Sequence, residues 1–246
     1  MKPFLLSSYL RDGGRTSYEN RSQNTPKSAD SPSTRIMLQF PAVQIDAGQG
    51  NIVMTDSNNY AYFLIGSQWY KMGSLTLKHV SVGPAGIWGV DLNNRVYKYV
   101  AGSFVFANGE TLQQVDAGGD SQVVGVTDTS TIHCLKSTIV SAYRKQSTLS
   151  WITLPGLLMY VSCSTKYGCW GVNSAENIYF TKITPSTCGI SGWIQVDGLA
   201  VMVEIGTDGS VFVVTRGGEV FQRREYGTKC RQMEMEVDVN RKRAFI

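Results

Sequence analysis

The sequence has few charged residues, only two histidines and no long apolar run. Charged residues make up 17% of the 246 positions, against ~25% in typical soluble proteins, and this composition argues against a coiled coil or a disordered chain. No stretch approaches the ~18–20 consecutive apolar residues that cross a bilayer, so we expect no membrane span. Glycine, at 25 residues, and aromatic residues, at 11%, are plentiful. Together they favour a β-rich body with many tight turns.

The excess of basic residues lies at the two ends of the chain. Residues 1–35 and 223–246 together carry thirteen basic and seven acidic side chains, whereas residues 36–222 carry ten basic and twelve acidic ones. A domain that binds a nucleic-acid duplex gathers Lys and Arg on a folded face, and the body has no such excess. We therefore expect no nucleic-acid partner.

Neither end of the chain resembles the body between them. Residues 1–35 are rich in Ser, Asn, Arg and Gly, and this composition predicts a disordered leader. The apolar run at residues 4–6 is shorter than the ~7–15 residues of a secretory signal, so no signal peptide is visible. Residues 231–246 alternate Met with Glu and Val with Asp before a basic end, and we expect an atypical C-terminal tail there. The folded body is predicted over residues 36–230.

Five segments of the body begin alike, and this repeat decides the predicted architecture. The similar openings lie at residues 44–48, 79–83, 114–118, 160–164 and 202–206. They are 35, 35, 46 and 42 residues apart, and a second apolar run, a polar turn and a third apolar run follow them. Where the block is complete, a fourth run carries Trp69, Phe104, Trp151 or Trp193.

Four short strands joined by polar turns in each block are the pattern of one blade of a β-propeller. A single four-stranded meander has two open edges and an apolar face that it cannot cover, and packing several blades around an axis covers those faces. We therefore predict an all-β fold, a β-propeller of four-stranded blades with five recognisable repeats and a sixth that is missing or incomplete. Trp88 and Trp170, in the second runs, are expected in the core between blades.

Four blocks of the repeat are specific enough to compare with a known family. They are KHVSVGPAGIWGV (78–90), QVDAGGD (114–120), CWGVNS (169–174) and GTDGSV (206–211). They resemble the tectonin repeat of fish-egg lectins and of the horseshoe-crab tachylectin related to them, and the resemblance covers about residues 44–230. It implies a secreted β-propeller lectin of eggs and innate immunity that recognises N-acetylglucosamine-type glycans and bacterial surface polysaccharide. Some lectins of this family bind calcium, so the resemblance makes calcium the one candidate cofactor.

Two features depart from the family pattern. Family members begin with a signal peptide, whereas this chain begins with the leader described above. The family pattern also has a sixth unit, with strands from both chain ends closing the ring, whereas here the fifth unit runs to about Cys230 and an unrelated tail follows. Without closure the first and fifth blades would expose apolar faces. Residues 36–40 and 233–239 are the candidate substitute edge strands.

The five cysteines allow two predicted disulfides. Cys163 and Cys169 flank the turn between the first two strands of unit four, so we expect them to pair across that hairpin. Cys188 and Cys230 occupy equivalent loop positions in neighbouring units, and a bond between them would join blades four and five and leave Cys134 over. Neither spacing matches a zinc site. Disulfides indicate an oxidising compartment, in agreement with the family.

The turns after the second strands are the candidate sugar-binding positions. Neutral glycans are held by hydrogen bonds from Asn, Asp, Arg and backbone groups, and a protein that repeats one polar turn gains from multivalent binding. The candidates are Asp56, Asn58, Asp91, Asn93, Asn94, Asp128, Asn173, Asn177 and Arg216. The alternative is that these residues only form the turns, since Asn, Asp and Gly are common turn formers.

Catalysis is not expected. His79 begins a repeat opening that has Gln, Tyr or Met in the other units, and His133 and Cys134, as neighbours on a strand, point to opposite faces of a sheet. Asp116 and Asp120 are a candidate carboxylate pair, but Asp116 matches an Asp of the first unit, which favours a structural role. The alternative to a lectin is a non-catalytic propeller that serves as a protein-interaction scaffold inside cells. Homo-oligomers are compatible with both functions.

Overall fold

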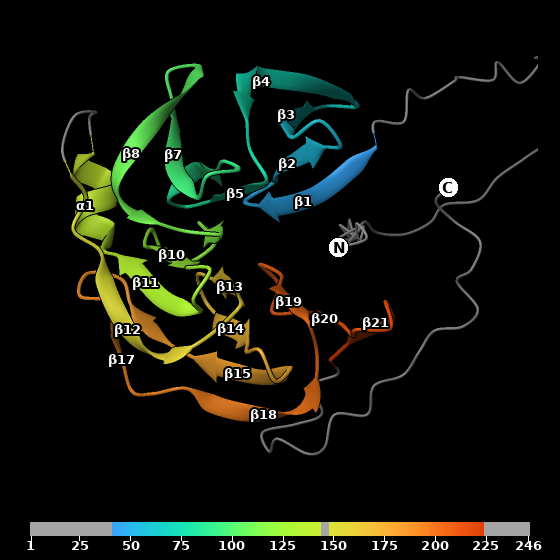
Figure 1. Ribbon diagram of the computed structural model, residues 1–246, viewed down its shortest axis with the longest axis vertical. Coiled ribbons are helices and arrows are strands. Elements are labelled where there is room, and N and C mark those ends of the chain that lie inside the picture. Colours follow the sequence, from blue (N-terminus) through green and yellow to red (C-terminus); the bar gives the residue numbers. More distant parts are fainter. Residues whose placement is uncertain (1–40, 144–147, 224–246) are drawn as a thin grey trace, which may run out of the picture.

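The computed structural model describes residues 41–143 and 148–223. These residues form the five antiparallel sheets of the ring, of which four have four strands and the fifth has three, and a separate two-stranded hairpin. The sheets are arranged one after another around a common axis, so the predicted all-β propeller is confirmed (Figure 1).

Every sheet is a meander that starts near the axis and moves outward (Figure 1). The first sheet consists of β1 (Ala42–Gly48), β2 (Asn51–Asp56), β3 (Tyr60–Ile65) and β4 (Gln68–Thr76). The second consists of β5 (His79–Gly83), β6 (Gly86–Val90), β7 (Arg95–Val100) and β8 (Ser103–Thr111). The third consists of β9 (Gln114–Asp116), β10 (Val123–Val126), β11 (Thr131–Leu135) and β12 (Ile152–Leu157). The fourth consists of β13 (Tyr160–Ser164), β14 (Gly168–Val172), β15 (Asn177–Thr181) and β18 (Ile194–Leu199). The fifth consists of β19 (Met202–Ile205), β20 (Val211–Val214) and β21 (Val220–Gln222).

The inner strands begin where the repeat predicts them. β5, β9, β13 and β19 start on the first residue of their repeat openings, and β1 starts two residues before Gln44. Each inner strand packs beside the next, from β1 through β5, β9 and β13 to β19. Because each of the first four blades has an even number of antiparallel strands, all five inner strands run in the same direction along the axis.

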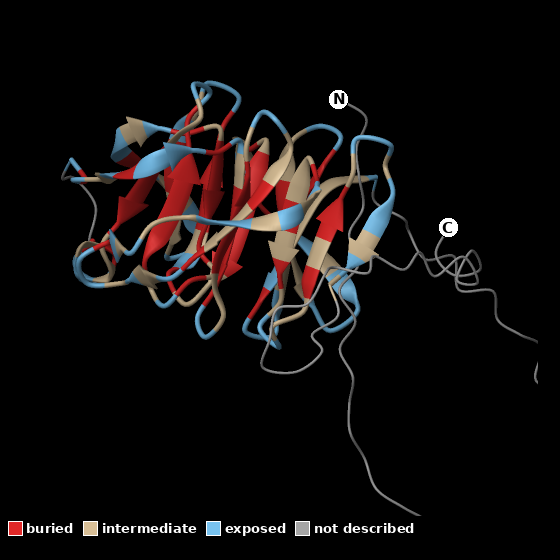
Figure 2. Ribbon diagram, turned by 90° about the horizontal axis from the view of Figure 1, so that it is seen from below, coloured by how far each residue is buried: buried red, intermediate tan, exposed pale blue. Residues whose placement is uncertain are grey.

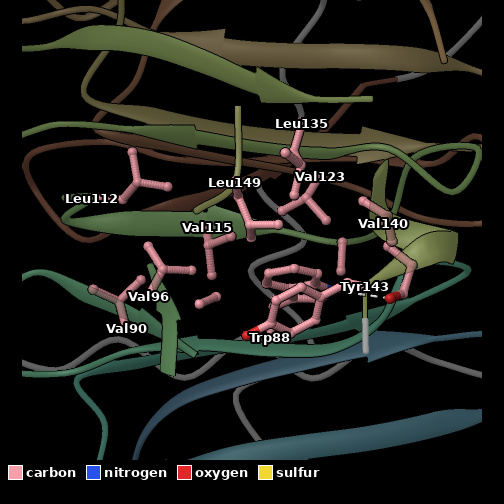
Figure 3. Packing of buried hydrophobic residues seen from close by; sticks show 13 residues of the cluster. Trp88, Val90, Val96, Leu112, Val115, Val123, Leu135, Val140, Tyr143 and Leu149 are labelled. Carbon is pink, nitrogen blue, oxygen red and sulfur yellow. Dashed lines mark hydrogen bonds between the residues drawn. The ribbon is translucent and has the colours of Figure 1, made fainter. Parts of the chain in front are cut away.

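The hydrophobic core is divided into layers between neighbouring blades. Between the second and third blades, Trp88, Val115 and Leu135 are fully buried, and the ring of Tyr143 packs against Trp88 (Figure 3). Trp170 lies in the corresponding layer between the fourth and fifth blades. The prediction that Trp88 and Trp170 are core residues is therefore confirmed. Figure 2 shows the buried parts of the strands in the middle of the disc and exposed turns on its two faces.

Neighbouring inner strands approach each other closely at the last residue of the first three repeat openings, which is glycine in each. A Cβ atom built on Gly48 would lie 2.2 Å from the carbonyl oxygen of Val82, and one built on Gly83 would lie 2.1 Å from that of Ala117. Any residue larger than glycine would collide with the backbone of the next blade. These glycines thus allow the inner strands of the first four blades to lie this close together.

Two insertions explain why the third and fourth repeats are longer than the first two. The short helix α1 (Ser137–Ala142) lies between β11 and β12, and the hairpin of β16 (Ile183–Thr184) and β17 (Gly189–Ile190) lies between β15 and β18. The insertions contact each other, since the N–H group of Ser137 donates to the carbonyl oxygen of Pro185 at 2.9 Å. They connect the outer parts of blades three and four.

One predicted disulfide is confirmed and the other is wrong. Cys163 and Cys169 face each other on β13 and β14 and are bonded. Cys188 is bonded to Cys134 on β11, and not to Cys230. The argument from equivalent positions fails because the hairpin that carries Cys188 packs against the third blade. Cys230 itself lies outside the described residues.

The first and fifth blades face each other across the one sector of the ring that no described strand occupies (Figure 1). Residues of β1 and β19 nevertheless line the same cavity at the axis, Asp46 among them on one side and Ile205 on the other. The predicted leader (1–35), the tail (231–246) and the candidate edge strands (36–40 and 233–239) all lie outside the described residues. Within residues 41–143 and 148–223, no helix is long and apolar enough to cross a membrane.

Candidate functional site

The five turns between the second and third strands of the blades share one geometry. In each turn the carbonyl oxygen of the first residue accepts a hydrogen bond of 2.9–3.1 Å from the N–H group of the fourth. The fourth residue has a left-handed backbone in every turn, with φ between 63° and 84°. These first and fourth residues are Asp56 and Asn59, Asp91 and Asn94, Thr127 and Ser130, Asn173 and Glu176, and Thr215 and Gly218. Because the inner strands run in one direction, all five turns lie on the same face of the ring, which we call the turn face.

The side chain of Asp56 holds its own turn. Its Oδ1 atom accepts the backbone N–H groups of Asn58 at 2.9 Å and Tyr60 at 2.8 Å. Its Oδ2 atom accepts the hydroxyl group of Tyr62 at 3.1 Å. The carboxylate is thus buried but fully hydrogen-bonded, as a buried charge requires.

Asp91 repeats this arrangement in the second blade and adds an ion pair. Oδ1 accepts the N–H groups of Asn93 and Arg95, both at 2.9 Å, and Oδ2 accepts Arg95 Nε at 2.7 Å and the Tyr97 hydroxyl at 3.2 Å. Burial alone would raise the pKa of Asp91, but these hydrogen bonds, led by those from Arg95, hold it below its ordinary value. The carboxylate therefore stays ionised and keeps the turn closed.

The other three turns follow the same pattern with a different first residue. Asn173 Oδ1 accepts the N–H groups of Ala175 at 3.0 Å and Asn177 at 2.9 Å. In the third and fifth turns a threonine hydroxyl, on Thr127 and Thr215, accepts the N–H group of the residue four positions later. In all five turns the side chain of the first residue, which is Asp, Asn or Thr, thus accepts a backbone N–H group and holds the turn.

A second group of polar side chains lies at the axis. Asp46, Asp116 and Ser162 line a cavity of about 20 Å³, enough room for about one water molecule. The charges that act on Asp116 come from Asp46 and Glu204, whereas Asp120 is exposed. Asp116 therefore belongs with the axial acids. This group was not predicted from the sequence, although its members stand at the third position of the repeat openings.

Over residues 41–242 the sequence matches the tectonin domain family. The chain belongs to the tectonin family. Among curated proteins, the fish-egg lectin of Cyprinus carpio is 42% identical to this tectonin over 112 residues, which are 45% of this chain and 46% of that lectin. The match thus spans about half the length of that relative.

Solved β-propellers share the fold of this tectonin at low sequence identity. The β-propeller domain of Cps50 (Swd1) from Myceliophteria thermophila is 8% identical with a TM-score of 0.55, over 81% of this chain and 71% of that one. Human WBSCR16 is 11% identical with a TM-score of 0.50, over 74% of this chain and 61% of that one. At such identities the likeness shows the fold alone.

The tectonin turns divide the predicted sugar-binding residues into two groups. Asp56, Asp91 and Asn173 use their side-chain acceptors to hold the turns. The second and third residues of every turn are exposed, and the exposed candidates are Asn58, Asn93, Asp128 and Arg216. Asn94 and Asn177 are half-buried, and Asn94 Oδ1 accepts the ammonium group of Lys78. Whether any of them contacts sugar stays a prediction.

The turn face also carries charged and apolar side chains. The guanidinium group of Arg216 forms an ion pair with Glu176, which joins the turns of blades five and four. Leu92, Leu157 and Leu199 are 59%, 63% and 55% exposed, respectively, in or beside these turns. The face therefore offers hydrogen-bonding groups next to apolar surface, a combination that marks interaction sites.

Replacing Asp91 by Ala is expected to lower the free energy of unfolding by about 2–3 kcal/mol, because four hydrogen-bond donors lose a buried, charged acceptor. Replacing Asn93, an exposed residue of the same turn, by Ala is expected to change it by less than about 0.5 kcal/mol. Urea unfolding of the two variants provides the comparison. Equal losses in both would show that the Asp91 carboxylate does not hold the turn.

The two histidines do not form a nucleophile–base pair in this tectonin. Burial, and then the charge of Lys78, lowers the pKa of His79 to about 3, so its ring is neutral at physiological pH. His133 Nδ1 lies 3.9 Å from Glu110 Oε1, and the neighbouring Cys134 has no free thiol because it is in a disulfide. In the part of the chain that the structure describes, no cluster of three or more His, Cys, Asp or Glu side chains is arranged to hold a metal ion.

Proposed function

We propose that this tectonin is a secreted, non-catalytic lectin that binds N-acetylglucosamine-type glycans on microbial or egg surfaces as part of innate immunity. The observation that carries the proposal is the turn face, where five turns of one geometry each expose their second and third residues. Membership of the tectonin family and the similarity to a fish-egg lectin support a glycan as the ligand.

The repeated geometry suits weak binding at several points. The side-chain amides of Asn58 and Asn93 can each donate and accept hydrogen bonds, and Arg216 can donate several. A glycan surface presents the same sugar many times, so simultaneous contacts can raise the apparent affinity by about 10²–10⁴ over one site. The exposed Leu92, Leu157 and Leu199 supply apolar surface beside these groups, on which the apolar face of a sugar ring can pack.

Retention on a chitin or N-acetylglucosamine resin, with elution by the free sugar, tests the proposal. We expect Asn93→Ala to weaken the apparent affinity about 2–10-fold, as for the loss of one or two hydrogen bonds. Asp197→Ala, an exposed substitution on the outer strand β18, should bind like the unmodified chain. No retention, or equal elution by an unrelated sugar, would refute the proposal. Runs with added calcium and with a chelator test the calcium requirement.

The second candidate function is a protein-interaction scaffold, and the exposed Leu92, Leu157 and Leu199 favour it. The two disulfides favour the lectin instead, because disulfides persist in oxidising compartments. Capture of a protein partner by the turn face, with no sugar retention and with the cysteines reduced in cells, would support the scaffold. Sedimentation of the purified chain measures homo-oligomers in either case.

A further inference from the structure

A series of hydrogen bonds joins the inner strands of successive blades around the axis. In each case the third residue of a repeat opening accepts the N–H group of the fourth residue in the next opening. The pairs are Asp46 with Val82 at 2.7 Å, Ser81 with Ala117 at 2.9 Å, Asp116 with Cys163 at 3.2 Å, and Ser162 with Ile205 at 3.2 Å. These side chains are therefore structural links between blades.

The third position of the openings carries an acid in alternate blades, and these acids, Asp46, Asp116 and Glu204, act on one another. Asp46 and Asp116 line the axial cavity, and the charges of Asp46 and Glu204 both act on Asp116. The carboxyl group of Glu204 accepts the Ser162 hydroxyl at 2.8 Å and also the Tyr160 hydroxyl. Three carboxyl groups thus meet at the centre of the ring.

No cation balances these acids in the described part of the ring. The nearby titratable groups are Tyr160 on β13, whose hydroxyl group donates to Glu204, and His79 on β5, whose ring lies against that of Tyr160. The interactions that shift the three carboxyl groups include none from Lys, Arg or His. His79 is neutral, and Tyr160 is protonated because burial, and then Glu204, raises its pKa. Three ionised carboxylates would therefore repel one another with no cation to offset the repulsion.

Burial and mutual repulsion make the acids retain protons. Burial, followed by the charge of Asp46, raises the pKa of Glu204 to about 8. Burial, followed by the charges of Asp46 and Glu204, raises the pKa of Asp116. Because these shifts favour the protonated forms, the native ring binds protons more tightly than the unfolded chain does above pH 4.5.

We propose that Asp46, Asp116 and Glu204 form a proton-sensitive contact between blades, which is stable while the group keeps a proton and loosens when that proton is lost above neutral pH. For Glu204, the stabilising effect of the proton is complete below about pH 4.5, its ordinary pKa, and is lost as the pH rises towards about 8. The ionised carboxyl groups then repel one another across the axis, and the inner strands separate more easily. This regulation goes beyond sugar binding and does not depend on it.

Thermal unfolding of the full chain between pH 5 and pH 9.5 tests the proposal. We expect Tm to fall by about 5–10 °C between pH 6 and pH 9. Glu204→Gln, which keeps the shape of the side chain and removes the charge, should lose at least half of this fall. The matched control is Glu219→Gln, an exposed residue of the same blade, which should keep the full fall.

A profile that is the same in the original chain, Glu204→Gln and Glu219→Gln would overturn the proposal. Since Glu204→Gln could fail to fold, carboxyl ¹³C NMR of the unmodified chain gives an independent answer. We expect at least one Asp or Glu carboxyl carbon to titrate above pH 7. Titration of all carboxyl groups below pH 5 would equally overturn the proposal.

Discussion

Removing the Cys134–Cys188 bond is expected to lower the free energy of unfolding by about 4 kcal/mol. The bond joins residues 54 positions apart, and a cross-link that closes a long loop removes much conformational entropy from the unfolded chain. It also fixes the hairpin of β16 and β17, whose Ile183 and Ile190 pack on the core between blades three and four. Urea unfolding of the Cys134→Ala/Cys188→Ala double variant measures this loss.

The second disulfide provides the control. Cys163 and Cys169 are only 6 positions apart, so the Cys163→Ala/Cys169→Ala variant should lose about 2 kcal/mol on the same entropic argument. Equal losses in the two double variants, or the reverse order, would show that strain or packing decides the effect and not loop length.

Gly83→Ala is expected to lower the free energy of unfolding by at least about 3 kcal/mol. The added methyl group would lie 2.1 Å from the carbonyl oxygen of Ala117 and 2.7 Å from the Cα atom of Gly118. Since these are backbone atoms, β5 and β9 would have to separate. That movement would break the hydrogen bond from Ala117 to Ser81 and open the core layer around Trp88.

Gly217→Ala is the matched control, because Gly217 is exposed and its added methyl group would meet nothing closer than 3.6 Å. Its effect should stay within about 0.5 kcal/mol. Urea midpoints and soluble yield of both variants check the prediction. A Gly83→Ala variant as stable as Gly217→Ala would mean that the inner strands are not held at this close distance.

The blade architecture could be predicted because its pattern survives changes of single residues. In blade two, Leu77 fills the space left by Gly89, where a Cβ atom would lie 2.7 Å from the leucine Cδ1 atom. In blade five, Ala200 and Val213 stand at the equivalent positions and are buried in one cluster. A large residue at one position goes with a small residue at the other, so the core stays densely packed although the residue types differ. The apolar pattern of the blade can therefore be recognised in the sequence even where the residues differ.

The insertions could not be predicted, because a repeat says nothing about segments without a counterpart in the other units. Helix α1 and the hairpin that carries Cys188 are of this kind, and the wrong disulfide follows from treating Cys188 as a repeat position. The turns were located correctly. The sequence did not show which of their side chains face inward, since an Asp can either hold a turn or project from it.

The hydrogen bonds at the axis also bear on the order of the blades around the ring. Gln44 and Gln114 bond both polar atoms of their amides to the backbone of the following blade, and each stands two residues before an aspartate. Blades two and four have Ser81 and Ser162 in place of those aspartates. The chemistry therefore recurs every second blade over blades one to four. Removing or adding a single blade in this stretch would bring two inner strands of one kind together, so these hydrogen bonds require the blades to keep their alternating order.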